Sequence, residues 1–145
     1  MIKIINSMNL LSDKPRPHYL VGNSEYEEQN GIYTLKSKVL FTPENPSVAD
    51  RLNLEIPHVN VGDAYFGLWN SIHIISEEAG WKNLLAVTGK YKSKNLLTDV
   101  ELDLETIISN VRTLHGKLFA DYKGTYSLNN KELLSLEGIG CGYVK

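Results

Sequence analysis

Polar residues at regular spacing on an apolar helical pattern are the first candidates for chemistry. Asp63, Gly67 and Asn70 follow the spacing i, i+4 and i+7, so a helix places them on one face. An otherwise apolar helix that keeps such a stripe is expected to line a cavity or an interface. His73 lies three residues beyond Asn70, near the same stripe. Because a buried amide is unfavourable unless it is satisfied, Asn70 favours a functional site or a buried polar network.

The start of this helix has the features that attack on a carbonyl carbon requires. Unpaired backbone N–H groups and the positive end of the helix dipole stabilise an oxyanion. Gly62 would let a substrate carbonyl approach the backbone closely, because it has no side chain. Asp63 is the first candidate for a general base or a water-orienting group. An acid in the first turn is also favoured by the dipole alone, so both interpretations stay open.

Three further residues near the helix start have a chemical and a structural interpretation. Asn60 is among the best helix N-cap residues, and that role is compatible with a functional one. His58 could contact the substrate or act as a base, or it could simply fix the approach to the helix. Tyr65 is expected to be a core or dimer contact, with hydrogen bonding to a substrate carbonyl as the alternative.

Several other classes of site are excluded by the sequence. There is no G-x-S-x-G motif and no P-loop, and the segment GIGCG has too little chain after it for the helix of a dinucleotide-binding site. The four histidines lack metal-ligand spacing, so no metal is predicted. Acyl transfer by side chains and backbone donors needs no cofactor beyond the carrier that is part of the substrate.

Composition and length predict a single domain over residues 1–145. Hydrophobic residues make up 42% and charged residues 22% of the chain, as in an ordinary globular protein. The net charge of -2 gives no reason to expect nucleic acid or an anionic membrane as partner. The single cysteine, Cys141, suits a reducing compartment, and no apolar run approaches the ~20 residues that span a bilayer. We therefore expect a cytoplasmic protein.

The pattern of apolar residues predicts an α+β fold. Residues 1–17 are expected to be irregular, because Pro15 and Pro17 block regular hydrogen bonding. Strands are predicted over 18–27 and 32–41, on either side of the turn Asn30–Gly31. Residues 42–57 are predicted to form a long loop with at most a short helical turn. Residues 62–80 form the clearest helix, apolar over most of its circumference. Four strands follow, near 81–92, 97–108, 110–122 and 133–144, so one long central helix is expected to be wrapped by a curved antiparallel sheet.

Two segments carry a resemblance to a known family. The segment HYLVGNSEYEEQNGIYTLKSKVLF resembles the opening hairpin of the type III fatty acyl-CoA thioesterases, the FcoT-like hotdog family. The segment IPHVNVGDAYFGLWNSIHII resembles that family's approach to its central helix, where a His-x-Asn precedes the helix and a second Asn lies inside it. The later strands resemble the closing strands of hotdog thioesterases in general. A fainter similarity links the helix start to bacterial AvrD-type proteins.

The resemblance implies a hotdog fold with an acyl-thioester pocket at a dimer interface, beside the start of the central helix. It matches Asn60 to the family's first asparagine, and Asn70 to the second if one extra residue is accepted between them. The family's tyrosine shortly before the helix has no counterpart, because residues 42–57 contain no tyrosine.

The leading hypothesis is an acyl-thioester hydrolase acting on acyl-CoA or on an acyl-carrier protein. Its catalytic candidates are Asp63, Asn70, Asn60 and His58, and its substrate-binding candidates are Gly62, Tyr65, Gly67 and His73. A dehydratase or acyltransferase on the same fold, or a non-catalytic acyl-binding module, are the alternatives. Because an isolated sheet of this kind has an edge to protect, we expect a homodimer or a higher homo-oligomer.

Overall fold

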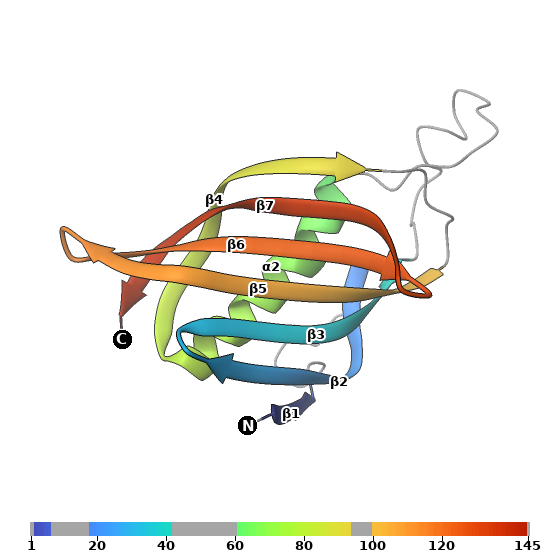
Figure 1. The fold of residues 1–145 in the computed structure, drawn as a ribbon, viewed down its shortest axis with the longest axis horizontal. Helices are drawn as coiled ribbons and strands as arrows, with labels where there is room; N and C mark the ends of the chain where they lie inside the picture. The colour runs from blue at the N-terminus through green and yellow to red at the C-terminus, as the bar shows by residue number, and fades with distance from the viewer. Residues whose placement is uncertain (1, 7–17, 42–60, 94–99, 145) are drawn as a thin grey trace.

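The computed structural model describes residues 2–6, 18–41, 61–93 and 100–144. One helix and seven strands are built from them, in an order that starts with three strands, continues with the helix and ends with four strands (Figure 1). The elements are β1 Ile2–Asn6, β2 His18–Gln29, β3 Ile32–Phe41, α2 Val61–Ala79, β4 Trp81–Ser93, β5 Val100–Leu114, β6 Lys117–Leu128 and β7 Lys131–Val144.

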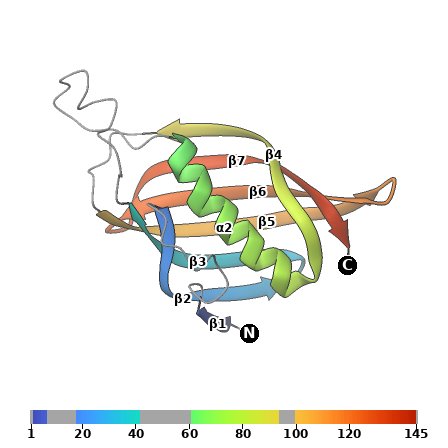
Figure 2. The same ribbon diagram turned by 180° about the vertical axis from the view of Figure 1, so that it is seen from behind.

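All strands belong to one antiparallel sheet in the order β1-β2-β3-β5-β6-β7-β4. The sheet curves, and α2 lies diagonally across its concave face, as the view from behind shows most clearly (Figure 2). The predicted α+β class and the single long helix on a curved antiparallel sheet are confirmed, and the arrangement fits a hotdog fold. The chain order places the helix between β3 and β4, so β4 must cross to the far edge of the sheet.

The core lies between α2 and the inward-facing residues of the strands. Along β6 the buried positions alternate with more exposed ones, as expected for a strand with one covered face. The inward side chains of the central strands are fully or almost fully buried; they include Leu35, Val39, Leu102, Leu104, Ile108, Leu118, Tyr122 and Tyr126. Alternation with period two therefore fixes which face of each strand meets the helix.

The helix buries one side and exposes a narrow stripe on the other. Leu68, Ile72 and Ile75 are buried against the sheet, whereas Trp69 is 47% exposed and His73 and Glu77 also face outward. The helix ends at Gly80, whose φ of 78° is the left-handed conformation predicted for this position. Among the residues that the structure describes, no helix combines the length and the apolar character needed to cross a bilayer.

The turn at Asn30–Gly31 is confirmed, but the prediction for the next hairpin is wrong. Both residues of the first turn have positive φ, 53° and 78°. Instead of breaking near residue 109, β5 continues to Leu114, and the chain turns at His115–Gly116, again with positive φ. Asn110 has a positive φ of 52°, but it forms a bulge inside the strand.

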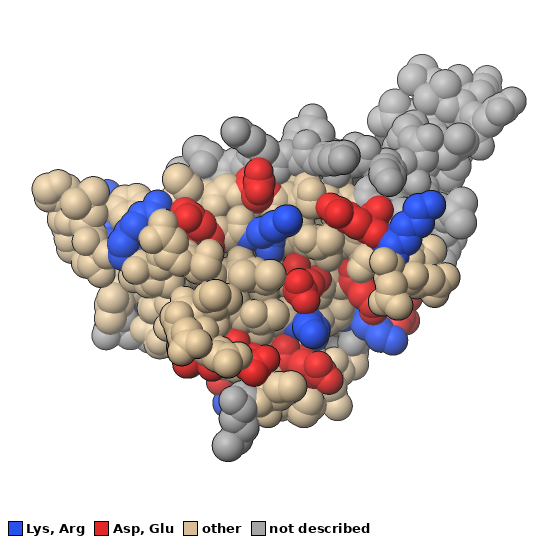
Figure 3. Space-filling view, in the orientation of Figure 1, with Lys and Arg blue, Asp and Glu red and all other residues tan. Residues whose placement is uncertain are grey.

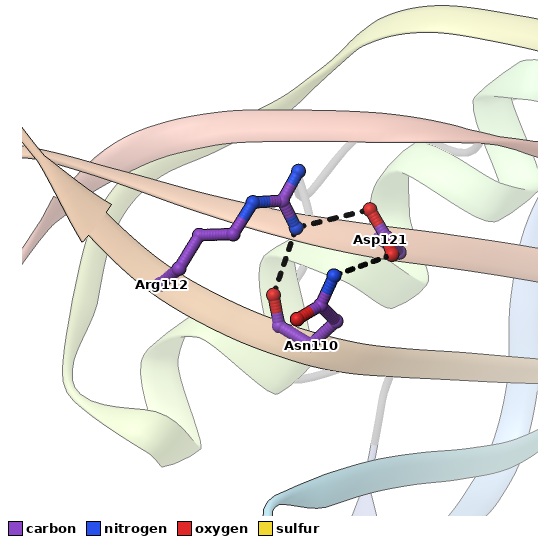
Figure 4. A network of polar contacts seen from close by, with 3 residues as sticks. All are labelled: Asn110, Arg112 and Asp121. Carbon is purple, nitrogen blue, oxygen red and sulfur yellow. Dashed lines mark hydrogen bonds and ion pairs between the residues drawn. The ribbon is translucent and has the colours of Figure 1, made fainter.

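A polar network explains why the chain does not turn at Asn110. Arg112 donates hydrogen bonds from Nη1 to the Asn110 carbonyl at 2.8 Å and to the Asp121 carboxylate at 3.1 Å, and the Asn110 amide donates to the same carboxylate (Figure 4). The hydrogen bond from Asn110 and then that from Arg112 lower the pKa of Asp121. The bulge is thus held from the neighbouring strand β6, which a local sequence pattern does not reveal.

The prediction for the first residues is also wrong. Residues 2–6, expected to be irregular, form β1, which pairs with β2 from Ile2–Glu27 to Asn6–Asn23. Lys3 of this strand forms an ion pair with Glu78 of α2, with 2.6 Å between Nζ and Oε2. Residues 7–17 and 42–60 lie outside the described residues, so the expectations for these segments are not tested.

The convex face of the sheet carries interspersed acidic and basic side chains (Figure 3). Lys36 of β3 pairs in register with Glu25 of β2 and Glu105 of β5, and Lys38 pairs in register with Asp103. Because opposite charges alternate across neighbouring strands, each charge has an opposite charge nearby. This face is solvated, as the polar residues of 32–41 predicted.

Thr106 gives the first testable prediction. Its side chain is fully buried on the inner face of β5, and its hydroxyl has no hydrogen-bond partner within the described residues. Replacing it by valine keeps the shape and removes the unsatisfied group, so Thr106→Val should raise the free energy of unfolding by roughly 1–3 kcal/mol. Urea unfolding measures this change. Thr125→Val, on the more exposed face of β6, should change little, and a loss of stability in Thr106→Val would contradict the interpretation.

Candidate functional site

The predicted site residues fall into three groups in the structure. His58 and Asn60 lie outside the described residues. Gly62, Asp63 and Tyr65 lie in the first turns of α2, where the structure describes the helical backbone and not their side chains. The third group, Gly67, Asn70 and His73, is fully described. The predicted helix start is thus confirmed, and the roles of the individual side chains stay predictions.

Gly67 is buried and faces the sheet, against side chains of β3 and β6. A Cβ atom built on Gly67 would overlap the hydroxyl oxygen of Tyr126 and lie 3.3 Å from a methyl carbon of Val39. Real Cβ atoms do not come this close to another heavy atom, so a larger residue here would have to displace the buried side chain of Tyr126. Of the stripe Asp63, Gly67 and Asn70, the middle residue Gly67 therefore packs against the core. The substrate role predicted for this glycine stays a prediction.

A second contact of the same kind lies one residue further along the helix. A Cβ atom on Gly124 of β6 would lie 2.5 Å from a methyl carbon of Leu68. The side chain of Leu68 is fully buried, and it occupies the space that the glycine leaves open in the strand. Helix and sheet thus interlock in both directions, with Tyr126 directed at a glycine of α2 and Leu68 directed at a glycine of β6.

Tyr126 is the residue that the sequence interpretation did not identify. It is 0% exposed, and its hydroxyl takes part in a hydrogen bond with the backbone of Leu68. Burial raises its pKa well above the ordinary value for tyrosine, so the hydroxyl is neutral at physiological pH. The available signal was the sequence Tyr122-x-Gly124-x-Tyr126, in which large and absent side chains alternate on the inner face of one strand.

The other two described candidates lie toward the open side of the helix. Asn70 is half-buried and lies on the helix between the buried Leu68 and Ile72 and the exposed Trp69 and His73. His73 is exposed beside Trp69, on the stripe that the sheet does not cover. Asn70 is therefore the described polar candidate best placed to meet a ligand that binds beside the helix.

Several buried hydroxyl groups lie at the interface between α2 and the sheet. Ser71 and Ser76 donate hydrogen bonds to the helix carbonyls of Gly67 and Ile72, at 3.1 and 2.7 Å. Ser37, 5% exposed on the inner face of β3, has no hydrogen-bond partner within the described residues, as is also true of Thr106. The helix–sheet interface therefore contains small polar residues where larger apolar ones would be expected, which allows close approach.

A cleft of about 390 Å³ lies on the other side of the sheet. Its lining comes from the strands and the turn after β6, and no residue of α2 contributes to it; it includes Asn23, Glu25, Lys36, Lys38, Asp103, Glu105, Ser127 and Asn130. Its three carboxylates and two lysines are paired in register, so each lysine already lies beside an acidic side chain of a neighbouring strand. In the described part of the chain, no group of three or more His, Cys, Asp and Glu residues is arranged to hold a metal ion.

Comparisons with known proteins show similarity of fold. A scan against protein-family models finds no match, and a search of curated protein sequences finds none. A candidate thioesterase from Lactococcus lactis matches with a TM-score of 0.58 at 10% sequence identity, over 84% of this chain and 91% of that chain. This likeness shows a shared fold.

Two further solved structures are less similar. An uncharacterized protein from Erwinia carotovora subsp. atroseptica gives a TM-score of 0.49 at 12% identity, over 85% of this chain and 93% of that chain. A candidate thioesterase from Shewanella oneidensis gives 0.44 at 9% identity, over 83% of both chains.

The Gly67 contact leads to a second prediction. Alanine is the better helix former by about 1 kcal/mol, yet Gly67→Ala should destabilise the fold by about 1–3 kcal/mol because its Cβ would overlap the Tyr126 hydroxyl. In a Tyr126→Phe background the overlap is removed, so the same substitution should be nearly neutral. Chemical denaturation of the four proteins in this cycle measures the coupling. Equal effects of Gly67→Ala in both backgrounds would rule out the contact, and a Tyr122→Phe background should leave the full effect.

Proposed function

We propose that this chain is a hotdog-fold hydrolase of acyl thioesters, with its reaction centre at the first turn of α2. The observation that carries the proposal is the placement of α2, which lies against the concave face of a strongly curved sheet. Its fold likeness to a candidate thioesterase and the resemblance of residues 56–75 to the FcoT-like family both support this choice. The substrate is an acyl-CoA or an acyl-carrier protein, whose CoA or phosphopantetheine belongs to the substrate.

In the proposed reaction, a water molecule attacks the thioester carbonyl carbon. The oxyanion that forms is stabilised by backbone N–H groups of the first helical turn, and Gly62 gives it access to them. Asp63 accepts a proton from the attacking water. Collapse of the oxyanion breaks the carbon–sulfur bond, and the proton passes to the departing thiolate, so that a carboxylic acid and a free thiol are formed.

The other predicted residues position the substrate around this centre. Asn70 lies two helical turns beyond Asp63 and is half-buried, so its amide can orient the water or the carbonyl group. His58, Asn60, Tyr65 and His73 stay candidates for the same task. The proposed enzyme works in the cytoplasm, which suits a protein with a free cysteine.

Two variants test the proposed reaction centre. Asp63→Asn and Asn70→Ala should each lower kcat/KM for thiol release from acyl-CoA by about 100-fold or more, because each removes a group that acts on the reacting atoms. A thiol-reactive dye measures the release across a panel of acyl-CoA and acyl-pantetheine thioesters. Asp103→Asn and Asn23→Ala, which lie away from the helix, are the matched controls and should retain full activity.

The result also separates the alternative functions. Undiminished turnover in both site variants would reject the assignment of these residues. Formation of an enoyl product from 3-hydroxyacyl thioesters, without release of thiol, would indicate a dehydratase. Binding of acyl-CoA by calorimetry with no turnover over hours would indicate an acyl-binding module.

The proposed enzyme is a homodimer. Strand β4 is 13 residues long, contains no proline, and has a neighbour on one side only among the described strands. Such an edge favours pairing with another chain. The exposed stripe of α2, formed by Trp69, His73 and Glu77, would meet the equivalent stripe if two β4 edges paired about a two-fold axis.

Analytical ultracentrifugation tests this assembly. At micromolar concentration the protein should sediment with twice the mass of one chain. Trp69→Glu should weaken the dimer at least tenfold in Kd, because it removes the large apolar side chain of the stripe and places a second carboxylate near Glu77. Leu114→Glu, at a residue that is 57% exposed on the β5–β6 hairpin, is the matched control. A monomer at every concentration, or equal effects of the two substitutions, would contradict the proposed dimer.

A further inference from the structure

The outer face of the sheet changes character toward the β5–β6 hairpin. Across its middle, lysines and carboxylates alternate between neighbouring strands (Figure 3). Near the hairpin, four outward side chains on two neighbouring strands are uncharged and mainly apolar: Phe119 of β6 and Ile139, Cys141 and Tyr143 of β7. We call these four residues the β6–β7 patch. Phe119 and Cys141 lie opposite each other in register, so the patch is continuous across the two strands.

The neighbours of these residues show that the patch faces away from the core. The buried positions of β6 alternate with Phe119, which is itself only half-buried. On β7, a Cβ atom built on Gly142 would lie 2.7 Å from backbone atoms of Leu84, so β4 closes the inner face there. The outward Ile139 and Tyr143 are 38% and 45% exposed. Contiguous apolar side chains that stay in solvent mark a surface for another molecule.

Charged residues frame the patch along β6. Lys117, Phe119 and Asp121 occupy successive outward positions of this strand, about 7 Å apart. Lys117 is exposed and takes part in none of the ion pairs formed among the described residues. Asp121 neutralises Arg112 of its own chain at 3.1 Å, and its side chain stays 44% exposed, with room for a further donor (Figure 4). The strand therefore presents a free positive charge on one side of Phe119 and a carboxylate on the other.

This order of side chains is complementary to itself. A two-fold axis that runs across the strands over Phe119 stacks two copies face to face, with their β6 strands antiparallel. Phe119 then lies over Phe119 of the second copy, and each Lys117 lies over an Asp121. On β7, Tyr143 lies over Ile139 of the second copy. Because packed sheets are separated by about 10 Å, the lysine and aspartate side chains can meet between them.

We propose that the β6–β7 patch is a contact surface for a second copy of this chain, with Phe119 at a two-fold axis and Lys117 paired with Asp121 across it. A second copy is the occupant that the symmetric placement of the two charges favours. The contact involves neither α2 nor the β4 edge, so it is independent of the proposed reaction and of the proposed dimer. Chains that already pair through β4 become a tetramer by this second contact.

The contact is weaker than pairing through β4. Both outer faces are convex, so they diverge away from the axis and bury less area than flat sheets would (Figure 1). Contacts of small area are transient, and we expect a Kd on the order of 100 µM. At micromolar concentration the contact is therefore unoccupied, and the mass of two chains expected from pairing through β4 is unchanged.

Sedimentation equilibrium of the full chain from micromolar to millimolar concentration tests the contact. The mass should double across this range. Lys117→Glu and Asp121→Lys should each weaken the doubling at least tenfold in Kd, because like charges then face each other across the axis. Lys131→Glu is the matched control, since it makes the same change of charge at an exposed residue at the far end of β7. The same losses should appear in a Trp69→Glu background, which separates this contact from pairing through β4.

A mixture of the two charge variants gives the sharpest test. Each pair across the axis joins residues of different copies, so one chain with Lys117→Glu and one with Asp121→Lys regain two pairs of opposite charge. The equimolar mixture should associate about as strongly as the wild type, although each variant alone does not. Circular dichroism checks that Asp121→Lys, which loses its bond to Arg112, keeps the fold. Tyr143→Glu leaves that network intact and should also weaken association at least tenfold.

The cysteine of the patch reports the axis directly. Cys141 is half-buried, is the single cysteine of the chain, and lies opposite itself in the proposed contact because it is in register with Phe119. A short bismaleimide should join two wild-type chains at high concentration and few chains of Lys117→Glu.

Three results would overturn the inference. The first is a mass that never doubles, which would leave the patch to a different protein. The second is doubling that persists in both Lys117→Glu and Tyr143→Glu, and the third is a mixture that associates no better than its components. None of these results bears on thioester hydrolysis.

Discussion

The structure depends on how closely one helix approaches one sheet. Gly67 of α2 and Gly124 of β6 lack side chains where the two elements meet, and Tyr126 and Leu68 occupy the spaces that they leave. Because protein interiors are close-packed, these reciprocal contacts fix both the depth and the position of the helix along the strands. The direction in which the helix N-terminus points follows from this packing, and with it the location of any site built there.

The sequence predicted the elements whose signals are local. Apolar spacing identified the helix, Gly80 marked its end, and Asn30–Gly31 identified the first hairpin turn, because each depends on residues close together in the chain. Asn110 misled the interpretation for a physical reason. Its positive φ belongs to a bulge held by Arg112 and by Asp121 of the next strand, and such long-range partners are not visible in a local pattern.

The candidate site was predictable in outline and not in detail. Spacing placed Asp63, Gly67 and Asn70 on one helix, and the structure confirms that helix. The partner of Gly67 could not be predicted, since Tyr126 is distant in sequence and meets the helix only because β6 turns that face toward it. A glycine inside an apolar helix indicates that another group approaches the helix backbone closely. Only the fold shows whether that group is a ligand or a core side chain.

The two sides of the sheet have different chemical characters. The convex side has paired charges and a cleft without helix residues, whereas the concave side has the helix, the buried hydroxyls of Ser37 and Thr106, and the half-buried Asn70. The proposed reaction centre belongs to the concave side, because backbone N–H groups at a helix start stabilise developing negative charge better than solvated side chains do.

A crystal structure with an acyl-CoA analogue that has a methylene in place of the thioester sulfur would test the central claim most directly. The account predicts that the carbonyl oxygen lies within hydrogen-bond distance of the backbone N–H groups in the first turn of α2. An acyl carbonyl bound in the convex cleft, or anywhere remote from that turn, would contradict it.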